Sequence, residues 1–205
     1  KTVKKLMVPY CKNIEIDAMN SVLCTVKEPK DGQPLVMLDA HLDEIGLMVT
    51  HIDDNGFLKV ASCGGVDYRM ILGRSVTVHA KEPVKGIVVC TEQDSKKIPD
   101  ADKVRIDTGM SGEYAREIIL PGDKITIDAP YTKLLSSNVT SRAFDDRAGC
   151  AVVVRAVQLL SEMNPECGVA AVFSVQEENG CRGAMTATFK TEPTHAIVTD
   201  VSFGH

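Results

Sequence analysis

Three short apolar runs, each ending in ionisable residues, constrain most strongly how this chain can fold. Leu35–Ala40 leads into His41-Leu42-Asp43-Glu44, Val169–Val175 into Gln176-Glu177-Glu178, and Ala196–Thr199 into Asp200. Such runs are typical of parallel strands that are buried on both faces. Because ligands of open α/β sheets bind beyond the carboxyl ends of these strands, we expect one imidazole and several carboxylates to meet at one sheet edge.

Helical segments accompany these strands. Residues 146–163 are nearly all helix formers, and Asn164-Pro165 ends the run. One apolar face is predicted along this helix, made up of Val152, Ala156, Leu159, Leu160 and Met163. Shorter helices are expected at residues 1–7 and 183–190, and two further strands at residues 14–16 and 21–26.

Between residues 46 and 138 the pattern changes to short alternating segments that are separated by turns such as Asp54-Asn55-Gly56 and Gly64-Gly65. Expected strands cover residues 47–51, 57–61, 75–79, 85–90, 104–107 and 124–128, with one helix at residues 111–119. Short strands at close turn spacing predict a small barrel or sandwich. We therefore predict a discontinuous α/β domain, residues 1–45 plus 139–205, with a β-rich insertion at residues 46–138.

Composition excludes several classes of protein. With 44% hydrophobic and 25% charged residues, the 205-residue chain can form a packed core, and its apolar runs are far too short to span a membrane. A net charge of −5 with 4% aromatic residues argues against nucleic-acid binding. Seven cysteines without a C-x-x-C pair argue against a disulfide framework and favour a reducing, cytoplasmic location.

The acidic residues at the strand ends predict a cation site. Another acidic pair, Asp145-Asp146, lies where the long helix begins. Clustered carboxylates repel one another unless a cation neutralises them, and imidazole with carboxylates suits zinc, cobalt or manganese. The His-x-Asp spacing lets Asp43 accept the second ring N–H of His41, which is the usual way of orienting a metal-bound imidazole.

Each motif alone also has a simpler explanation. A His-x-Asp segment is common in loops, Asp145-Asp146 could cap the helix, and Glu177-Glu178 could be a solvated surface pair. Only their joint position at strand ends favours a metal site. The remaining histidines considered have no such context and are expected to be structural or surface residues: His51, His79 and His195.

Four longer motifs follow one another in a specific order. They are Leu38-Asp39-Ala40-His41-Leu42-Asp43-Glu44-Ile45-Gly46, Ser141-Arg142-Ala143-Phe144-Asp145-Asp146-Arg147-Ala148-Gly149, Val175-Gln176-Glu177-Glu178-Asn179-Gly180-Cys181-Arg182-Gly183-Ala184 and Val198-Thr199-Asp200. In this order they closely resemble the tetrahedral (TET-type) aminopeptidases, a family of dinuclear metallopeptidases that includes glutamyl and deblocking aminopeptidases. The resemblance implies a zinc-peptidase-like α/β sandwich domain with an inserted PDZ-like barrel domain.

The resemblance also implies roles for single residues. His41, Asp145 and Asp200 would bind one divalent ion, zinc or cobalt, and Asp145 would bridge to a second ion that Glu178 also binds. Glu177 would be the general base, and Asp43 would orient His41. The peptide bond between Asp145 and Asp146 would be cis.

Peptide substrates, a dimerisation role for residues 46–138 and assembly into tetrahedral dodecamers are further implications of the resemblance. It also implies that the full-length protein extends beyond both ends of this chain, and that a histidine of the C-terminal extension completes the second metal site. Two alternatives stay open. Asp145 and Glu177 could be the carboxylate pair of a glycoside hydrolase, or the chain could be an inactive assembly or peptide-binding fragment.

Overall fold

The computed structural model describes residues 1–91 and 101–202. The chain divides into two compact units, Lys1–Glu44 with Ala143–His205, and Ile45–Arg142. We refer to these as the α/β unit and the barrel unit. The change in pattern along the sequence placed the expected boundaries after residues 45 and 138.

The α/β unit contains a five-stranded sheet in the order β1-β2-β12-β3-β13. Its strands are β1 (Asn13–Ile16), β2 (Val22–Lys27), β3 (Leu35–His41), β12 (Gly168–Ser174) and β13 (His195–Val198). Strands β12 and β13 pair with β3 in parallel, whereas β1 and β2 form an antiparallel extension. The three apolar runs of the sequence are thus neighbouring parallel strands.

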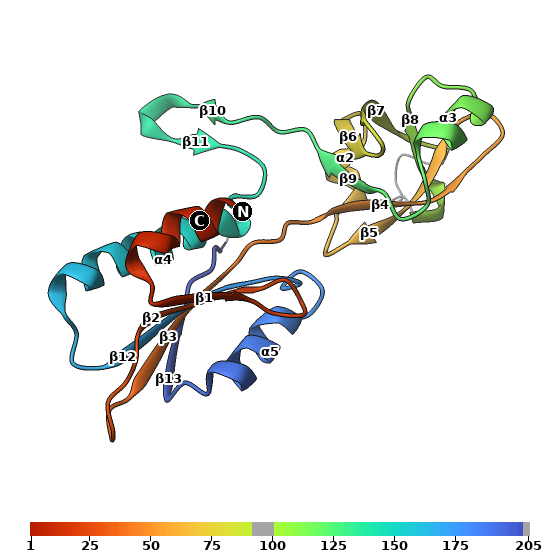
Figure 1. Ribbon diagram of the computed structural model, residues 1–205. Coiled ribbons are helices and arrows are strands. Elements are labelled where there is room, and N and C mark those ends of the chain that lie inside the picture. The colour runs from red at the N-terminus through yellow and green to blue at the C-terminus, as the bar shows by residue number, and fades with distance from the viewer. Residues whose placement is uncertain (92–100, 203–205) are drawn as a thin grey trace. The chain divides into compact units, whose positions relative to one another are not determined.

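Helices cover both faces of this sheet, as Figure 1 shows. The helices are α1 (Thr2–Met7), α4 (Phe144–Met163) and α5 (Arg182–Thr191), and a 3-10 turn, Val8–Tyr10, follows α1. Leu38 and Phe173 belong to the core that also holds buried residues of α1 and α4. Their chain neighbours Met37 and Val172 pack with Ala187 of α5 instead. Because successive strand residues point to opposite faces, the continuous apolar runs serve two helical layers.

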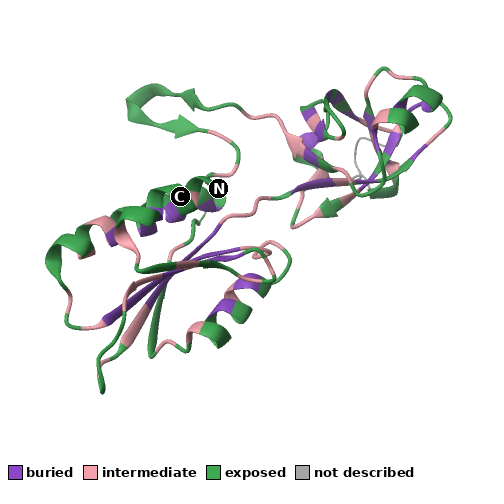
Figure 2. Ribbon diagram, viewed as in Figure 1, coloured by how far each residue is buried: buried purple, intermediate pink, exposed green. Residues whose placement is uncertain are grey.

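Two sequence-based expectations about burial were wrong. Strand β13 is exposed along its whole length, because it is the edge strand of the described sheet (Figure 2). In α4, Val152, Leu159 and Met163 of the predicted face are exposed, and only Ala156 and Leu160 pack against the core. The buried face contains Gly149, Cys150, Val153, Val154 and Val157. Apolar residues surround most of this helix, so its sequence alone does not specify which stripe packs on the sheet.

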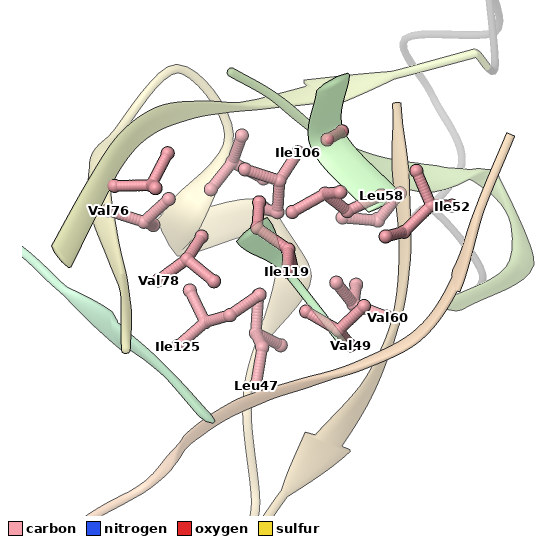
Figure 3. Packing of buried hydrophobic residues seen from close by; sticks show 14 of the residues in the cluster. Leu47, Val49, Ile52, Leu58, Val60, Val76, Val78, Ile106, Ile119 and Ile125 are labelled. Atoms are coloured by element: carbon pink, nitrogen blue, oxygen red, sulfur yellow. The ribbon is translucent and has the colours of Figure 1, made fainter. Parts of the chain in front are cut away.

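The barrel unit is closed by six strands in the order β4-β5-β8-β7-β6-β9. They are β4 (Gly46–Ile52), β5 (Leu58–Cys63), β6 (Ser75–His79), β7 (Pro83–Cys90), β8 (Val104–Asp107) and β9 (Lys124–Ile127). Alternate side chains point inward and form a core of Leu, Ile and Val residues (Figure 3). Closure removes the open sheet edges that would otherwise expose backbone groups.

Short elements complete the barrel unit. They are helices α2 (Tyr68–Ile71) and α3 (Gly112–Ile118), 3-10 turns at Ala101–Lys103 and Leu135–Ser137, and the two-residue strands β10 (Thr132–Lys133) and β11 (Val139–Thr140). Among the helices of the described residues, none has the length and apolar character needed to cross a membrane. The five-stranded sheet with its helices and the six-stranded barrel confirm the prediction of an α/β fold with a β-rich barrel.

Candidate metal centre

The candidate site lies at the carboxyl ends of the three parallel strands of the α/β unit. His41 is the last residue of β3 and pairs in register with Ser174, the last residue of β12. Glu177 and Glu178 lie three and four residues after β12, and Asp200 lies two residues after β13. Parallel pairing of β12 and β13 with β3 thus brings all these side chains to one sheet edge, as the sequence predicted.

Nε2 of His41 is the centre of this cluster. It lies 3.0 Å from Oδ1 of Asp145, 3.8 Å from Oε2 of Glu177 and 3.9 Å from Oδ1 of Asp200. The imidazole is 2% exposed, whereas the Asp145 carboxylate is 59% exposed. A buried nitrogen is therefore surrounded by carboxylates that open toward solvent.

Two overlapping groups of donor atoms have the spacing of metal ligands. One consists of His41, Asp145 and Asp200, and the other of His41, Glu177 and Glu178. Within each group the donor atoms lie within 4.8 Å of one another. The first group contains the same three residues that the resemblance assigned to one ion. The second includes Glu178, which was assigned to the other ion.

The two aspartates at the start of α4 have different environments. The peptide bond between Asp145 and Asp146 is cis, as expected. Asp146 is completely buried and accepts the backbone N–H of Gly149 at 3.0 Å. The capping explanation is therefore correct for Asp146, whereas Asp145 faces His41. A Cβ at Gly149 would lie 2.4 Å from the Asp146 carboxylate, so this cap requires glycine.

Asp43 connects the two halves of the cluster. Its Oδ1 lies 3.5 Å from Nδ1 of His41, but the two atoms are not hydrogen-bonded, so the orienting bond that the sequence predicted is not formed. Its two oxygens also accept the backbone N–H groups of Glu177 and Glu178, at 3.2 and 3.3 Å. Asp43 therefore holds the turn that carries the two glutamates, a contact that the sequence did not reveal.

Beneath the cluster lie two buried acids that were not singled out as site residues, Asp39 and Asp146. Asp39 is 3% exposed, and its Oδ2 accepts a hydrogen bond from Ser174 Oγ at 3.3 Å. One carboxylate oxygen of Asp39 and one of Asp146 have no partner. An aspartate inside an otherwise apolar run is the signal that could have identified Asp39, because charged residues are seldom buried without a function or a partner.

The electrostatics of the site favour added positive charge. Burial raises the pKa of the Glu178 carboxyl, and the Asp145 carboxylate raises it further. Burial also raises the pKa values of Asp39 and Asp146. Burial lowers the pKa of His41, but the hydrogen bond that Asp145 accepts and the charges of Asp43, Glu177 and Asp200 outweigh it, so the net pKa is raised. Glu178, Asp39, Asp146 and His41 therefore hold protons more tightly than isolated side chains of the same type do.

These residues fit a divalent cation. One imidazole nitrogen and carboxylate oxygens are the ligands that zinc and related ions prefer. A bound cation would replace the protons that the raised pKa values indicate and would neutralise the repulsion between the carboxylates.

Comparisons with known proteins agree with this geometry. A family model described as M42 glutamyl aminopeptidase matches residues 20–205. A putative aminopeptidase from Acetivibrio thermocellus is 39% identical over 192 residues, which cover 92% of this chain and 56% of that protein. The chain therefore spans about half the length of this curated relative.

Two solved structures have the same fold. An aminopeptidase from the archaeon Desulfurococcus kamchatkensis superposes with a TM-score of 0.90 at 33% identity, covering 98% of this chain and 56% of that one. The TET1 peptidase of Pyrococcus horikoshii, described as able to assemble into a tetrahedron or a large octahedral shell, superposes with a TM-score of 0.86 at 28% identity. That match covers 97% of this chain and 61% of the other.

Proposed function

Because the chain belongs to the M42 glutamyl aminopeptidase family, we propose that its full-length protein is a metal-dependent aminopeptidase that removes N-terminal residues from peptides. The observation that carries this proposal is the convergence of His41 with carboxylates from three separate segments. In a metallopeptidase, the buried imidazole and the carboxylates around it would be metal ligands.

The proposal assigns the ligands as follows. His41, Asp145 and Asp200 hold one divalent ion, and Asp145 with Glu178 contributes to a second, with zinc or cobalt as the candidates. Ions held by these residues would supply Lewis-acid chemistry, which lowers the pKa of bound water to about 7 and polarises a peptide carbonyl. A remaining ligand for the second ion would come from outside this chain, as the resemblance implies.

Glu177 has the position of a general base. Its Oε2 lies 3.8 Å from His41 Nε2, so the carboxylate borders the ligand cluster. In the proposed reaction Glu177 accepts a proton from the attacking water and delivers it to the leaving amine. Asp43 keeps His41 and the Glu177 turn in place through the contacts at 3.5 and 3.2 Å.

The partners of this protein are also proposals. Peptides are the proposed substrates, and self-association to dimers and a tetrahedral dodecamer is proposed from the resemblance. The Pyrococcus horikoshii relative, described as able to assemble into a tetrahedron or a large octahedral shell, supports self-association. The barrel unit would supply the dimer contact as a PDZ-like domain. The seven cysteines, all within the described residues, form no disulfide bond, which supports a reducing, cytoplasmic setting.

Metal binding by His41 is the first test. We expect His41→Ala in the full-length protein to lose bound metal, as determined by elemental analysis after dialysis. His51→Ala is the control, because His51 is an exposed residue of the barrel unit. Retention of the full metal content by His41→Ala would contradict the assignment.

Turnover by Glu177→Gln is the second test. We expect this variant to retain metal but to lose about 10²–10⁴ in kcat, because the proton acceptor is missing. That loss corresponds to an increase of roughly 2.7–5.5 kcal/mol in the activation free energy. Near-normal cleavage of aminoacyl chromogenic substrates would exclude Glu177 as the base.

Chelator sensitivity distinguishes the peptidase from the glycoside hydrolase alternative. A peptidase of this type is inhibited by chelators, whereas a carboxylate-pair glycosidase does not require metal. Hydrolysis of a polysaccharide that persists in chelator would favour the glycosidase. Stable oligomers without metal or activity would favour a structural role.

A further inference from the structure

The turn between β12 and α5 carries the proposed base and ends at a cysteine. The backbone N–H groups of Gly180 and Cys181 both donate to the carbonyl oxygen of Glu177, at 2.8 and 2.9 Å. Gly183 N–H then donates to Val175 O at 2.9 Å, which joins the start of α5 to the chain after β12. Cys181 is therefore held against Glu177 by the backbone itself.

The Cys181 side chain makes a second contact with the same residue. Its Sγ–H donates to Oε1 of Glu177 at 3.3 Å. The other carboxylate oxygen, Oε2, is the one that lies 3.8 Å from His41 Nε2. One oxygen of the Glu177 carboxylate thus accepts a hydrogen bond from the thiol, and the other faces the ligand cluster.

Helix capping does not account for a cysteine at this position. Cys181 is the N-cap residue of α5, but its side chain makes no capping hydrogen bond. Its backbone is left-handed, with φ at 55°, a conformation that favours glycine or asparagine. Cys181 is also the one cysteine among the seven, all within the described residues, that is exposed. Its recorded side-chain partner is Glu177.

We propose that Cys181 is a positioning residue, whose thiol holds one oxygen of Glu177 so that the other oxygen faces the proton to be transferred. This inference rests on the proposed role of Glu177 as general base. A thiol is a weak donor, so its contribution is modest and concerns the orientation of the base more than the stability of the fold.

Kinetics of Cys181 variants test the proposal in the full-length, metal-loaded protein. We expect Cys181→Ala to lower kcat by about 3–10-fold, with KM and metal content unchanged, because one weak hydrogen bond to the base is lost. Cys181→Ser retains a donor and is expected to restore most of the rate. Cys167→Ala is the matched control, since Cys167 precedes β12 and is outside the site.

Several outcomes would overturn the proposal. Cys181→Ala with the kcat of the wild type would show that the thiol does not position the base. A Cys181→Ser variant as slow as Cys181→Ala would show that a donor at this position does not matter. A rise in KM or a loss of metal with unchanged kcat would indicate a structural role instead.

A second measurement does not depend on activity. The Glu177 carboxylate raises the pKa of the Cys181 thiol, and the thiolate is the form that reacts with iodoacetamide. In metal-free protein we expect Glu177→Gln to accelerate alkylation of Cys181 about threefold or more, as mapped by mass spectrometry, with Cys167 as internal reference. An unchanged rate would refute the thiol–carboxylate contact.

The two measurements separate failure of this inference from failure of the proposed function. A wild-type protein that contains metal but cleaves no peptide would refute the function, and the alkylation rates would still decide whether the thiol holds Glu177. An active wild type with normal Cys181→Ala kinetics would refute only the role of Cys181.

Discussion

At the scale of single residues, protons and metal ions compete for Nε2 of His41. Nε2 of His41 faces three carboxylates, which keep the pKa of this histidine above its ordinary value despite burial. Metal binding requires the neutral imidazole, so it must release this proton. Metal affinity is therefore expected to fall as the pH drops through the raised pKa of His41.

Asp43 gives a sharper prediction at this scale. We expect Asp43→Ala in the full-length protein to lower metal affinity by about 10–100-fold, because it removes the contacts to His41 and to the Glu177 and Glu178 backbone. Competition with a chelator of known affinity measures this effect. Asp53→Ala is the control, since Asp53 likewise accepts two backbone N–H groups, but in the barrel unit. Equal affinities of wild type and Asp43→Ala would contradict the prediction.

The junction of β12 and α5 is the critical feature at the element scale. Gly183, in the first turn of α5, packs against the chain after β12, and a Cβ there would lie 2.2 Å from Val175 O and 2.6 Å from Val175 N. Backbone atoms cannot move aside as the end of a flexible side chain can. The position of the turn that carries Glu177 therefore depends on a residue without a side chain.

Gly183→Ala tests this dependence. We expect it to destabilise the protein by about 1–3 kcal/mol, as overpacking of a close contact does, and to lower kcat through displacement of the Glu177 turn. Denaturant unfolding measures the first effect and peptide hydrolysis the second. Gly65→Ala is the control, because a Cβ at Gly65 meets no atom within 4 Å. A Gly183→Ala protein as stable and active as Gly65→Ala would show that the junction tolerates a side chain.

Which helix face is buried could not be predicted at the element scale. The periodicity of α4 indicated a helix correctly, but Val152 and Met163 are exposed while Val153 and Val157 are buried. Apolar residues occur on both stripes, so the hydrophobic pattern alone leaves the rotation of the helix undetermined. Packing against the buried residues of β3 and β12 decides which stripe is buried.

The balance of charge in the metal-free protein belongs to the scale of the whole molecule. Burial raises the pKa values of Asp39 and Asp146, and nearby carboxylates raise that of His41. A group with a raised pKa binds its proton more tightly in the folded state, so it stabilises the fold at low pH and less as the pH rises. Asp128, whose pKa is lowered by Lys85, has the opposite effect: it stabilises the fold above its ordinary pKa, and this contribution is lost as the pH falls through its lowered pKa.

We therefore expect the metal-free protein to lose stability as the pH rises from the ordinary pKa values of Asp39, Asp146 and His41 through their raised values, and divalent ions to reverse this loss. Thermal unfolding in chelator, and again with zinc, measures both effects. Asp39→Asn removes one buried acid and should weaken the pH dependence. A metal-free protein that becomes more stable over the same range would contradict this reading of the cluster.

The sequence by itself determined the local chemistry: three apolar strands, the acidic residues that follow them, and a β-rich segment inserted between two halves of an α/β unit. Those features depend on side-chain periodicity and on residues close together in the chain, which sequence patterns report directly. The tertiary structure alone decided that β13 is an exposed edge strand, that Asp146 caps α4 while Asp145 faces His41, and that Cys181 contacts Glu177. These outcomes depend on strand order, on helix rotation and on contacts between segments, since packing energy is shared among residues that are distant in the chain.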